Sequence, residues 1–337
     1  MRPYLLITID TESDDLWAGR AELTFQNILQ MPRLQTFFEG YGIRPTYLIT
    51  YPVAVSREGR EIFGPIARSG RAEIGSHMHV WTTPPIVPVT ENDPAYAPLA
   101  MEIPPDLVRE KMVNVTKAVG ELAGYQPRSH RAGRFGLGGR GLRILEELGY
   151  VVDTSVTPLW SWQEASPNGG LRGPDFRHAP LEPYFPDYED LTRPGASKIL
   201  EVPTSYFISR PLPRRMAMWL ARRPRNHSLV RALRWSGLVR HGWLRPGRDV
   251  TASQLVGTAK ALLAAGLNVL NVMFHSSEMA AGTSPATRTA AAVDDSYRQM
   301  EMLFGFLIHQ ARAKPVGLCE LREVGQWRTP PPTSLHQ

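Results

Sequence analysis

Residues 4–12 read YLLITIDTE, a short apolar run that ends on the carboxylates of Asp10 and Glu12. Similar apolar runs end near His77, Arg131 and His275, and helix-like stretches lie between them. Strands that alternate with helices indicate a parallel α/β fold. In such folds the C-terminal ends of the strands gather on one face, where active sites form. The sequence therefore predicts a parallel β/α barrel of seven or eight units, with these side chains on one face.

The barrel is expected to form a single domain over residues 1–325, followed by a tail over 326–337. Residues 157–198 are rich in Pro, Gly, Trp and Tyr, and we expect a loop insertion over the active face. Residues 210–248 contain eleven arginines interleaved with apolar residues, which predicts a basic helical insertion. The run Pro315–Leu318 is expected to be the last strand.

Three interpretations of the arginine-rich stretch Arg210–Arg248 remain open. It could lie on an anionic membrane surface. It could bind a phosphate-bearing substrate. It could equally be a solvated helical hairpin whose apolar stripe packs on the barrel. Nucleic acid is not expected as a partner, because no recognition motif accompanies the charge.

Composition narrows the class of protein. The net charge is +6, and Cys319 is the only cysteine, which excludes an intrachain disulfide framework and cysteine-rich zinc sites. No uncharged apolar run reaches the length of a membrane-spanning helix. The apolar run at the N-terminus is too short for a signal peptide. We therefore expect a cytoplasmic protein, with the inner membrane surface as a further location if the basic stretch binds lipid.

The polar strand ends have the residue types of a catalytic zinc site, which uses three nitrogen or oxygen ligands and an open position. His77 and His79 are two residues apart, so on a strand they share a face. A carboxylate from the first strand would complete the set. Each group alone also has a structural explanation: carboxylates as helix caps, histidines bonded to backbone, Arg131 in a solvated turn and His275 at the edge of the core.

Taken together, the motifs resemble those of the polysaccharide deacetylases, the NodB-homology enzymes of carbohydrate esterase family 4. The resemblance covers about residues 1–318, and its motifs occur in order at Thr8–Glu12, Glu73–His79, Ser129–Gly136, Gly149–Ser155, Glu201–Pro203 and Phe274–Glu278. It implies a distorted barrel around a divalent metal, most often Zn²⁺, and removal of acetyl groups from amino sugars.

Residue by residue, the resemblance implies that Asp10 is the general base and His275 the general acid, with Arg131 holding the base carboxylate. His77 would bind the metal. Two positions depart from the family pattern. Thr11 occupies the usual position of the metal-binding aspartate, so Glu12 would take that role. The second histidine usually follows the first by four residues, where this chain has Trp81, so His79 would be the third ligand by proximity.

Several further residues are candidates at the same face. Trp81, Phe135 and Glu278 are predicted to contact substrate, and Asp153 to lie behind the site, where it could orient His275. Trp160 and Trp162 could stack on a sugar ring or pack as local core.

The predicted activity is removal of an N-acetyl group from a saccharide that contains an amino sugar, or from a glycolipid or nucleotide-sugar precursor in envelope polysaccharide synthesis. Two alternatives remain. One is a metal-dependent hydrolase of another acyl or cyclic amide bond. The other is a catalytically silent protein on the same scaffold that binds saccharide or membrane.

Overall fold

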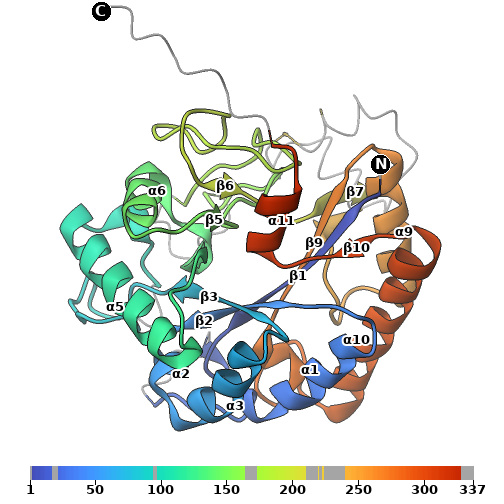
Figure 1. The fold of residues 1–337 in the computed structure, drawn as a ribbon, viewed down its shortest axis with the longest axis horizontal. Helices are drawn as coiled ribbons and strands as arrows, with labels where there is room; N and C mark the ends of the chain where they lie inside the picture. The colour runs from blue at the N-terminus through green and yellow to red at the C-terminus, as the bar shows by residue number, and fades with distance from the viewer. Residues whose placement is uncertain are drawn as a thin grey trace, which may run out of the picture.

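The computed structural model describes residues 2–16, 22–93, 97–163, 173–209, 219, 222–223 and 240–327. Within these residues, eight parallel strands form one curled sheet surrounded by helices (Figure 1). The strands are β1 (Tyr4–Thr11), β2 (Thr46–Thr50), β3 (Glu73–Met78), β4 (Ser129–Ala132), β5 (Val152–Asp153), β6 (Leu200–Glu201), β9 (Val269–His275) and β10 (Lys314–Pro315). The predicted distorted parallel barrel is confirmed.

The helices follow the strands in the order expected of β/α units. They are α1 (Met31–Glu39), α2 (Tyr51–Val55), α3 (Arg57–Arg68), α5 (Pro105–Ala123), α6 (Gly138–Glu147), α9 (Ala252–Ala264), α10 (Ala290–Phe304) and α11 (Leu318–Val324). The apolar period that predicts a helix over Asp106–Leu122 corresponds to α5, which begins at Pro105 and ends before Gly124 in the left-handed conformation.

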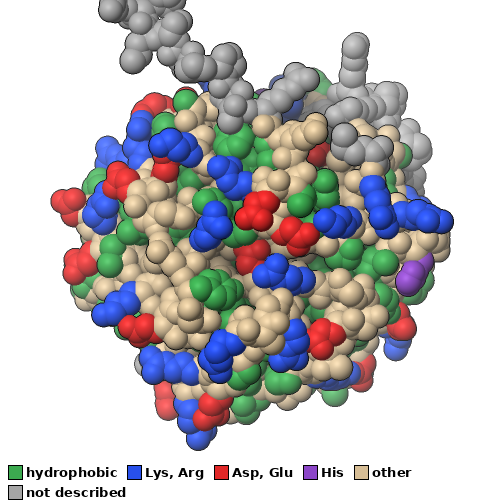
Figure 2. Space-filling model, in the orientation of Figure 1, with side chains coloured by type: hydrophobic (Ala, Val, Ile, Leu, Met, Phe, Trp, Pro, Cys, Tyr) green, Lys and Arg blue, Asp and Glu red, His purple; other side chains and the backbone are tan. Residues whose placement is uncertain are grey.

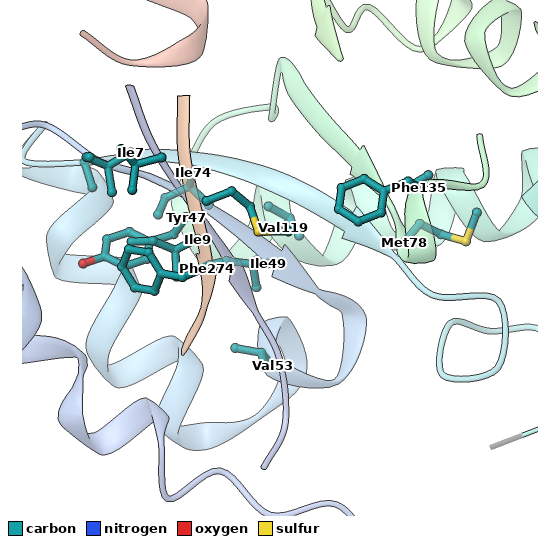
Figure 3. Packing of buried hydrophobic residues seen from close by; sticks show 14 of the residues in the cluster. Ile7, Ile9, Tyr47, Ile49, Val53, Ile74, Met78, Val119, Phe135 and Phe274 are labelled. Atoms are coloured by element: carbon teal, nitrogen blue, oxygen red, sulfur yellow. The ribbon is translucent and has the colours of Figure 1, made fainter. Parts of the chain in front are cut away.

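The outward face of the sheet packs against these helices. Figure 3 shows Ile7 and Ile9 of β1, Ile49 of β2 and Phe274 of β9 in one apolar layer with Val119 of α5. Side chains alternate along a strand, so the neighbouring positions Leu6, Thr8 and Asp10 point into the barrel. The strands thus present an apolar face to the helices. Their inner face is apolar at one end of the barrel and polar at the other.

The interior changes from apolar to polar along the strand direction. Its floor is the cluster Leu6, Leu48, Val152 and Leu200, closed by Leu318 and Leu321 of α11. The backbone N–H of Leu318 donates to Thr46 Oγ1, and that of Cys319 to Glu73 Oε2, at the start of β2 and β3. The predicted strand Pro315–Leu318 is therefore wrong beyond Pro315, because Leu318 begins this closing helix.

The barrel closes without a continuous ladder between β6 and β9. After β6, the N–H of Ser205 donates to the carbonyl of Asn271 at 3.2 Å, and the N–H of Asn271 donates to Ser205 Oγ at 2.9 Å. The buried Asn271 amide accepts from Thr8 Oγ1 at 2.8 Å and donates to Thr154 Oγ1 at 3.1 Å. One side chain of β9 thus bonds β1 and the chain that follows β5 across the barrel.

Two insertions leave the barrel. The described part of 157–198 contains only isolated bridges, as expected of a loop. Most of Arg210–Arg248 lies outside the described residues. Its end departs from the predicted helix, because Arg240–Trp243 forms β8, which pairs antiparallel with β7 (Tyr206–Ser209). The Tyr206–Trp243 ring contact favours this ribbon over a helix.

Replacement of Asn271 by Ala should lower the free energy of unfolding by about 1–3 kcal/mol, because buried hydrogen-bonding partners on β1 and after β5 lose their bonds. Urea denaturation measures the change. Asn268→Ala, one residue before β9 and partly exposed, is the matched control and should stay within about 0.5 kcal/mol of wild type. Equal effects of the two substitutions would contradict the role assigned to Asn271.

Candidate metal centre

Strand register places the polar residues at one level of the barrel. Asp10 of β1 is the register partner of His275 of β9, and His77 of β3 is the partner of Arg131 of β4. Register partners in a parallel sheet point to the same side, so all four side chains enter the interior together. The structure thus brings together the residues that the sequence analysis placed at one face.

Glu12, His77 and His79 form a compact triangle of donor atoms. Glu12 Oε1 lies 3.0 Å from His77 Nε2 and 3.1 Å from His79 Nε2, and the two Nε2 atoms are 2.8 Å apart. All three side chains are buried. Ligands at about 2.0–2.1 Å from a tetrahedral zinc lie about 3.4 Å from each other, close to these separations.

The hydrogen-bond roles of the imidazoles favour a cation at this triangle. His77 Nδ1 lies 2.8 Å from the carbonyl oxygen of Arg131, so Nδ1 carries the proton and Nε2 of the neutral ring presents a lone pair. His79 Nδ1 is buried without a hydrogen-bond partner. Two imidazole nitrogens and a carboxylate oxygen that converge on one point are the donor types of a metal site. The residues present therefore fit a divalent ion.

Electrostatics act on the same three groups. Burial alone would raise the pKa of the Glu12 carboxyl, but the charges and hydrogen bonds of His79 and His77 outweigh it and hold that pKa well below its ordinary value. Burial would lower the pKa of His77, whereas the carboxylates of Asp10 and Glu12 raise it. Burial lowers the pKa of His79. Glu12 is thus an anion and His79 is neutral, the forms that bind metal.

Glu12 follows the end of β1, and its backbone is held by residues distant in sequence. Its N–H donates to Ser276 Oγ at 3.1 Å, and its carbonyl accepts from Asn27 Nδ2 at 3.0 Å. Asn27 is in turn bonded to Asp14. Ser276 lies within the motif Phe274–Glu278, but no role was predicted for it. Asn27 was not predicted, because nothing in its local pattern distinguishes it from an ordinary loop residue.

Asp10 and Arg131 form a buried ion pair beside the triangle. The Arg131 guanidinium is fully enclosed and donates from Nη1 to Asp10 Oδ1 at 2.5 Å, from Nη2 to Thr8 Oγ1 at 2.8 Å, and from Nε to the Thr154 carbonyl at 3.0 Å. Burial would raise the pKa of Asp10, but the adjacent Arg131 charge outweighs it, so this pKa is lowered. Arg131 thus leaves Asp10 Oδ2 as the oxygen that faces the centre.

His275 approaches the same oxygen from β9. Asp10 Oδ2 lies 3.8 Å from His275 Nε2 and 3.9 Å from His77 Nε2. The Nδ1 atom of His275 lies 3.9 Å from Glu278 Oε1, and its backbone N–H donates to Glu278 Oε2 at 3.2 Å. Glu278 also forms an ion pair with Arg245. The geometry gives Glu278 contacts within the protein, and its predicted contact with substrate stays a prediction.

The predicted aromatic residues lie against this centre. The ring of Trp81, only 8% exposed, stacks on His79 with centroids 4.5 Å apart. Phe135 stacks on Trp162 at 5.1 Å and lies beneath the Arg131 guanidinium at 5.9 Å. Trp162 continues to Trp243 of β8 at 5.9 Å. An aromatic cluster therefore leads from Arg131 to the β7–β8 ribbon, and its contact with a sugar stays a prediction.

Asp153 lies on the outer side of the barrel wall. Its carboxylate accepts from the N–H and the hydroxyl of Ser155, whose Oγ accepts from the N–H of Ala132. Asp153 is the register partner of Glu201, and both side chains are fully buried. It therefore supports the chain that follows Arg131, through Ser155. Glu201 was not predicted as part of this support.

Outside the metal centre, positively and negatively charged side chains are intermixed. Among the described residues, arginines such as Arg143 and Arg128 pair with Glu189 and Glu323. Figure 2 shows basic and acidic side chains interspersed over the visible face. No described helix is both long and apolar enough to cross a membrane.

Sequence comparison finds no matching family model and no matching curated protein. The fold, in contrast, has solved relatives. One is a Mycobacterium smegmatis protein to which polysaccharide deacetylase activity is ascribed (15% identity, 96% of this chain, 90% of that chain, TM-score 0.53). Another, from Parabacteroides distasonis, is described as a glycoside hydrolase/deacetylase (15% identity, 96% of this chain, 71% of that chain, TM-score 0.63).

A third relative is the 4-alpha-glucanotransferase of Thermococcus litoralis (11% identity, 96% of this chain, 41% of that chain, TM-score 0.53). At these identities the likeness establishes the fold alone, and a glucanotransferase shares it. The chain thus has the distorted barrel fold found in proteins described as polysaccharide deacetylases, as its motif order predicts.

Removal of the Arg131 charge should be strongly destabilising. Arg131→Met leaves the Asp10 carboxylate buried without its partner, which should lower the free energy of unfolding by about 3–5 kcal/mol. Denaturant titration measures this change. The double variant Asp10→Asn/Arg131→Met, in which no charge is stranded, should lose less than Arg131→Met alone. A double variant at least as unstable as the single one would contradict the ion-pair interpretation.

Glu201 should make stability depend on pH. Burial, and then the adjacent Asp153 carboxylate, raise the pKa of Glu201 well above its ordinary value. The folded state therefore keeps a proton that the unfolded state loses near pH 4, and stability should fall as pH rises from there through the raised pKa. Glu201→Gln should flatten this fall in urea titrations across pH. Substitution of the exposed Glu91 by Gln should leave the fall of stability with pH unchanged. The same fall in Glu201→Gln as in wild type would refute the prediction.

Proposed function

We propose that this protein is a divalent-metal-dependent hydrolase that removes the N-acetyl group from an amino-sugar-containing saccharide. One observation carries the proposal: Asp10 Oδ2 lies 3.9 Å from His77 Nε2 of the Glu12–His77–His79 triangle and 3.8 Å from His275 Nε2. A metal-ligand set, a carboxylate and a second imidazole thus meet at one point.

Amide hydrolysis needs an activated water, stabilisation of the oxyanion and protonation of the amine. A divalent ion bound by Glu12, His77 and His79, with Zn²⁺ as the first choice, would lower the pKa of water and polarise the carbonyl. The proton transfers of the reaction are left to side chains of this protein.

Asp10 is placed to act as the general base. Arg131 occupies its Oδ1 atom and keeps it ionised, so Oδ2 is the oxygen available to take a proton from the attacking water. His275 is placed to act as the general acid, because its Nε2 points to the centre while its backbone is tied to Glu278. Two opposed proton carriers are what cleavage of an amide requires, since the amine leaves only when protonated.

The choice of an acetylated amino sugar as substrate rests on two supports. The fold occurs in proteins described as polysaccharide deacetylases. The aromatic cluster of Phe135, Trp162 and Trp243 begins at Arg131, and aromatic rings offer flat apolar faces for sugar rings. We propose this cluster, with Trp81, as the substrate side of the centre.

The test measures acetate release from N-acetylglucosamine oligosaccharides and from a nucleotide-linked N-acetylglucosamine, with Zn²⁺ present and after chelation. His275→Gln should lower kcat by about 10²–10⁴, the usual contribution of a general acid, and His77→Ala should lose both metal and activity. His309→Gln, which replaces an exposed histidine outside these motifs, is the control. Ring opening of a cyclic amide without acetate release, or full acetate release by His77→Ala, would overturn the proposal.

A further inference from the structure

His79, like Glu12, lies just beyond the end of its strand. The strand β3 ends at Met78, whose partner on β4 is Ala132, so no ladder pairing fixes the residue that follows. The chain turns immediately, and the N–H of Thr83 donates to the carbonyl of His79 at 3.1 Å. The position of the His79 ring therefore depends on the loop of residues 80–85, called here the His79 loop.

The helix α5 holds this loop through two side chains. Lys111 Nζ donates to the carbonyls of Val80 at 2.8 Å, Thr83 at 2.7 Å and Pro85 at 2.5 Å. One turn further along the helix, Asn114 Nδ2 donates to the Pro84 carbonyl at 3.0 Å. Four of the six carbonyls of the loop are thus bound by one face of α5.

A lysine at this position is not explained by packing. Lys111 is 0% exposed and lies on the buried face of α5, whose other members include Val108, Met112 and Val115. Burial of an ammonium group is unfavourable unless it is fully hydrogen-bonded. Three carbonyl acceptors match the three N–H bonds that only the charged form offers.

The charge of Lys111 is under opposing influences. Burial lowers its pKa to about 8, and the carboxylates of Asp93 and Glu110 act against this shift. At neutral pH the ammonium form therefore prevails, and its bonds to the carbonyls are charge-assisted and strong.

We propose that Lys111 and Asn114 are positioning residues that fix the His79 loop, so that His79 can serve as a metal ligand two residues after His77. The loop replaces the sheet as the support of this ligand. The inference rests on the metal site proposed above. It explains how a short His-x-His spacing, with Trp81 stacked on the ring, presents both Nε2 atoms to one point.

The experiment compares full-length variants. Lys111→Met keeps the length of the side chain and removes its charge and donors. Asn114→Ala is the milder variant, for use if Lys111→Met does not fold. Lys117→Met, an exposed lysine on the same helix, controls for the substitution. Val119→Ala, a buried apolar truncation on the same helix, controls for general loss of stability.

Two measurements are made on each variant. The first is the Zn²⁺ dissociation constant, from competition with a chromophoric chelator. Residues that orient metal ligands contribute about 10–100-fold to affinity, so Lys111→Met should weaken binding by about that factor and Asn114→Ala by less. The second is the hydrogen exchange rate of the Thr83 amide in metal-free protein labelled at threonine, which should rise by about tenfold or more in Lys111→Met.

The outcomes separate this inference from the proposed metal site. Wild-type affinity for Zn²⁺ in Lys111→Met, or equal weakening in Val119→Ala, would overturn the positioning role. If wild-type protein binds no Zn²⁺, the metal site is wrong, and the exchange of the Thr83 amide still decides whether Lys111 fixes the loop. An unchanged exchange rate in Lys111→Met overturns the inference in either case.

Discussion

The buried ion pair between Arg131 and Asp10 is the interaction on which the centre depends. The guanidinium spans the barrel, because it bonds Asp10 and Thr8 of β1 and the chain after β5 while its own backbone belongs to β4. Such a pair is costly to bury and tolerable only when its hydrogen bonds are nearly complete. The polar layer above the apolar floor therefore forms as a unit: Arg131 fixes one carboxylate oxygen and orients the other.

Strand endings made the fold and the grouping of the site predictable. Asp10, His77, Arg131 and His275 each end an apolar run, and parallel strands bring such ends together. Residues that support them were not predictable in the same way. Asn27, Ser276 and Lys111 act through the backbone of distant loops, and no local pattern marks such contacts. Two elements were also hard to predict. The helix α9 is rich in alanine and lacks a clear apolar stripe. The β7–β8 ribbon depends on pairing between strands that a long insertion separates in sequence.

The chemistry of the barrel lies in its side chains rather than in its fold. A glucanotransferase and proteins described as deacetylases share this architecture at identities of 11–15%. Two donor pairs distinguish the present chain, Asp10 with Glu12 and His77 with His79. Within each pair, the first member lies on a strand and points inward. The second member, Glu12 or His79, lies just past the strand end, where contacts with loops set its direction.

The closure of the barrel has a mechanical consequence. Among the described residues the ladder is unbroken from β9 through β1 to β6, whereas the chain after β6 meets β9 through hydrogen bonds of Asn271 with Val202, Pro203 and Ser205. Deformation is easiest along this seam. Widening there would move the aromatic cluster beside Tyr206 and Trp243 yet leave the paired strands that carry Asp10, His77 and His275 in register. Asp10, His77 and His275 thus lie on the stiff arc of the wall, and the aromatic cluster borders the compliant arc.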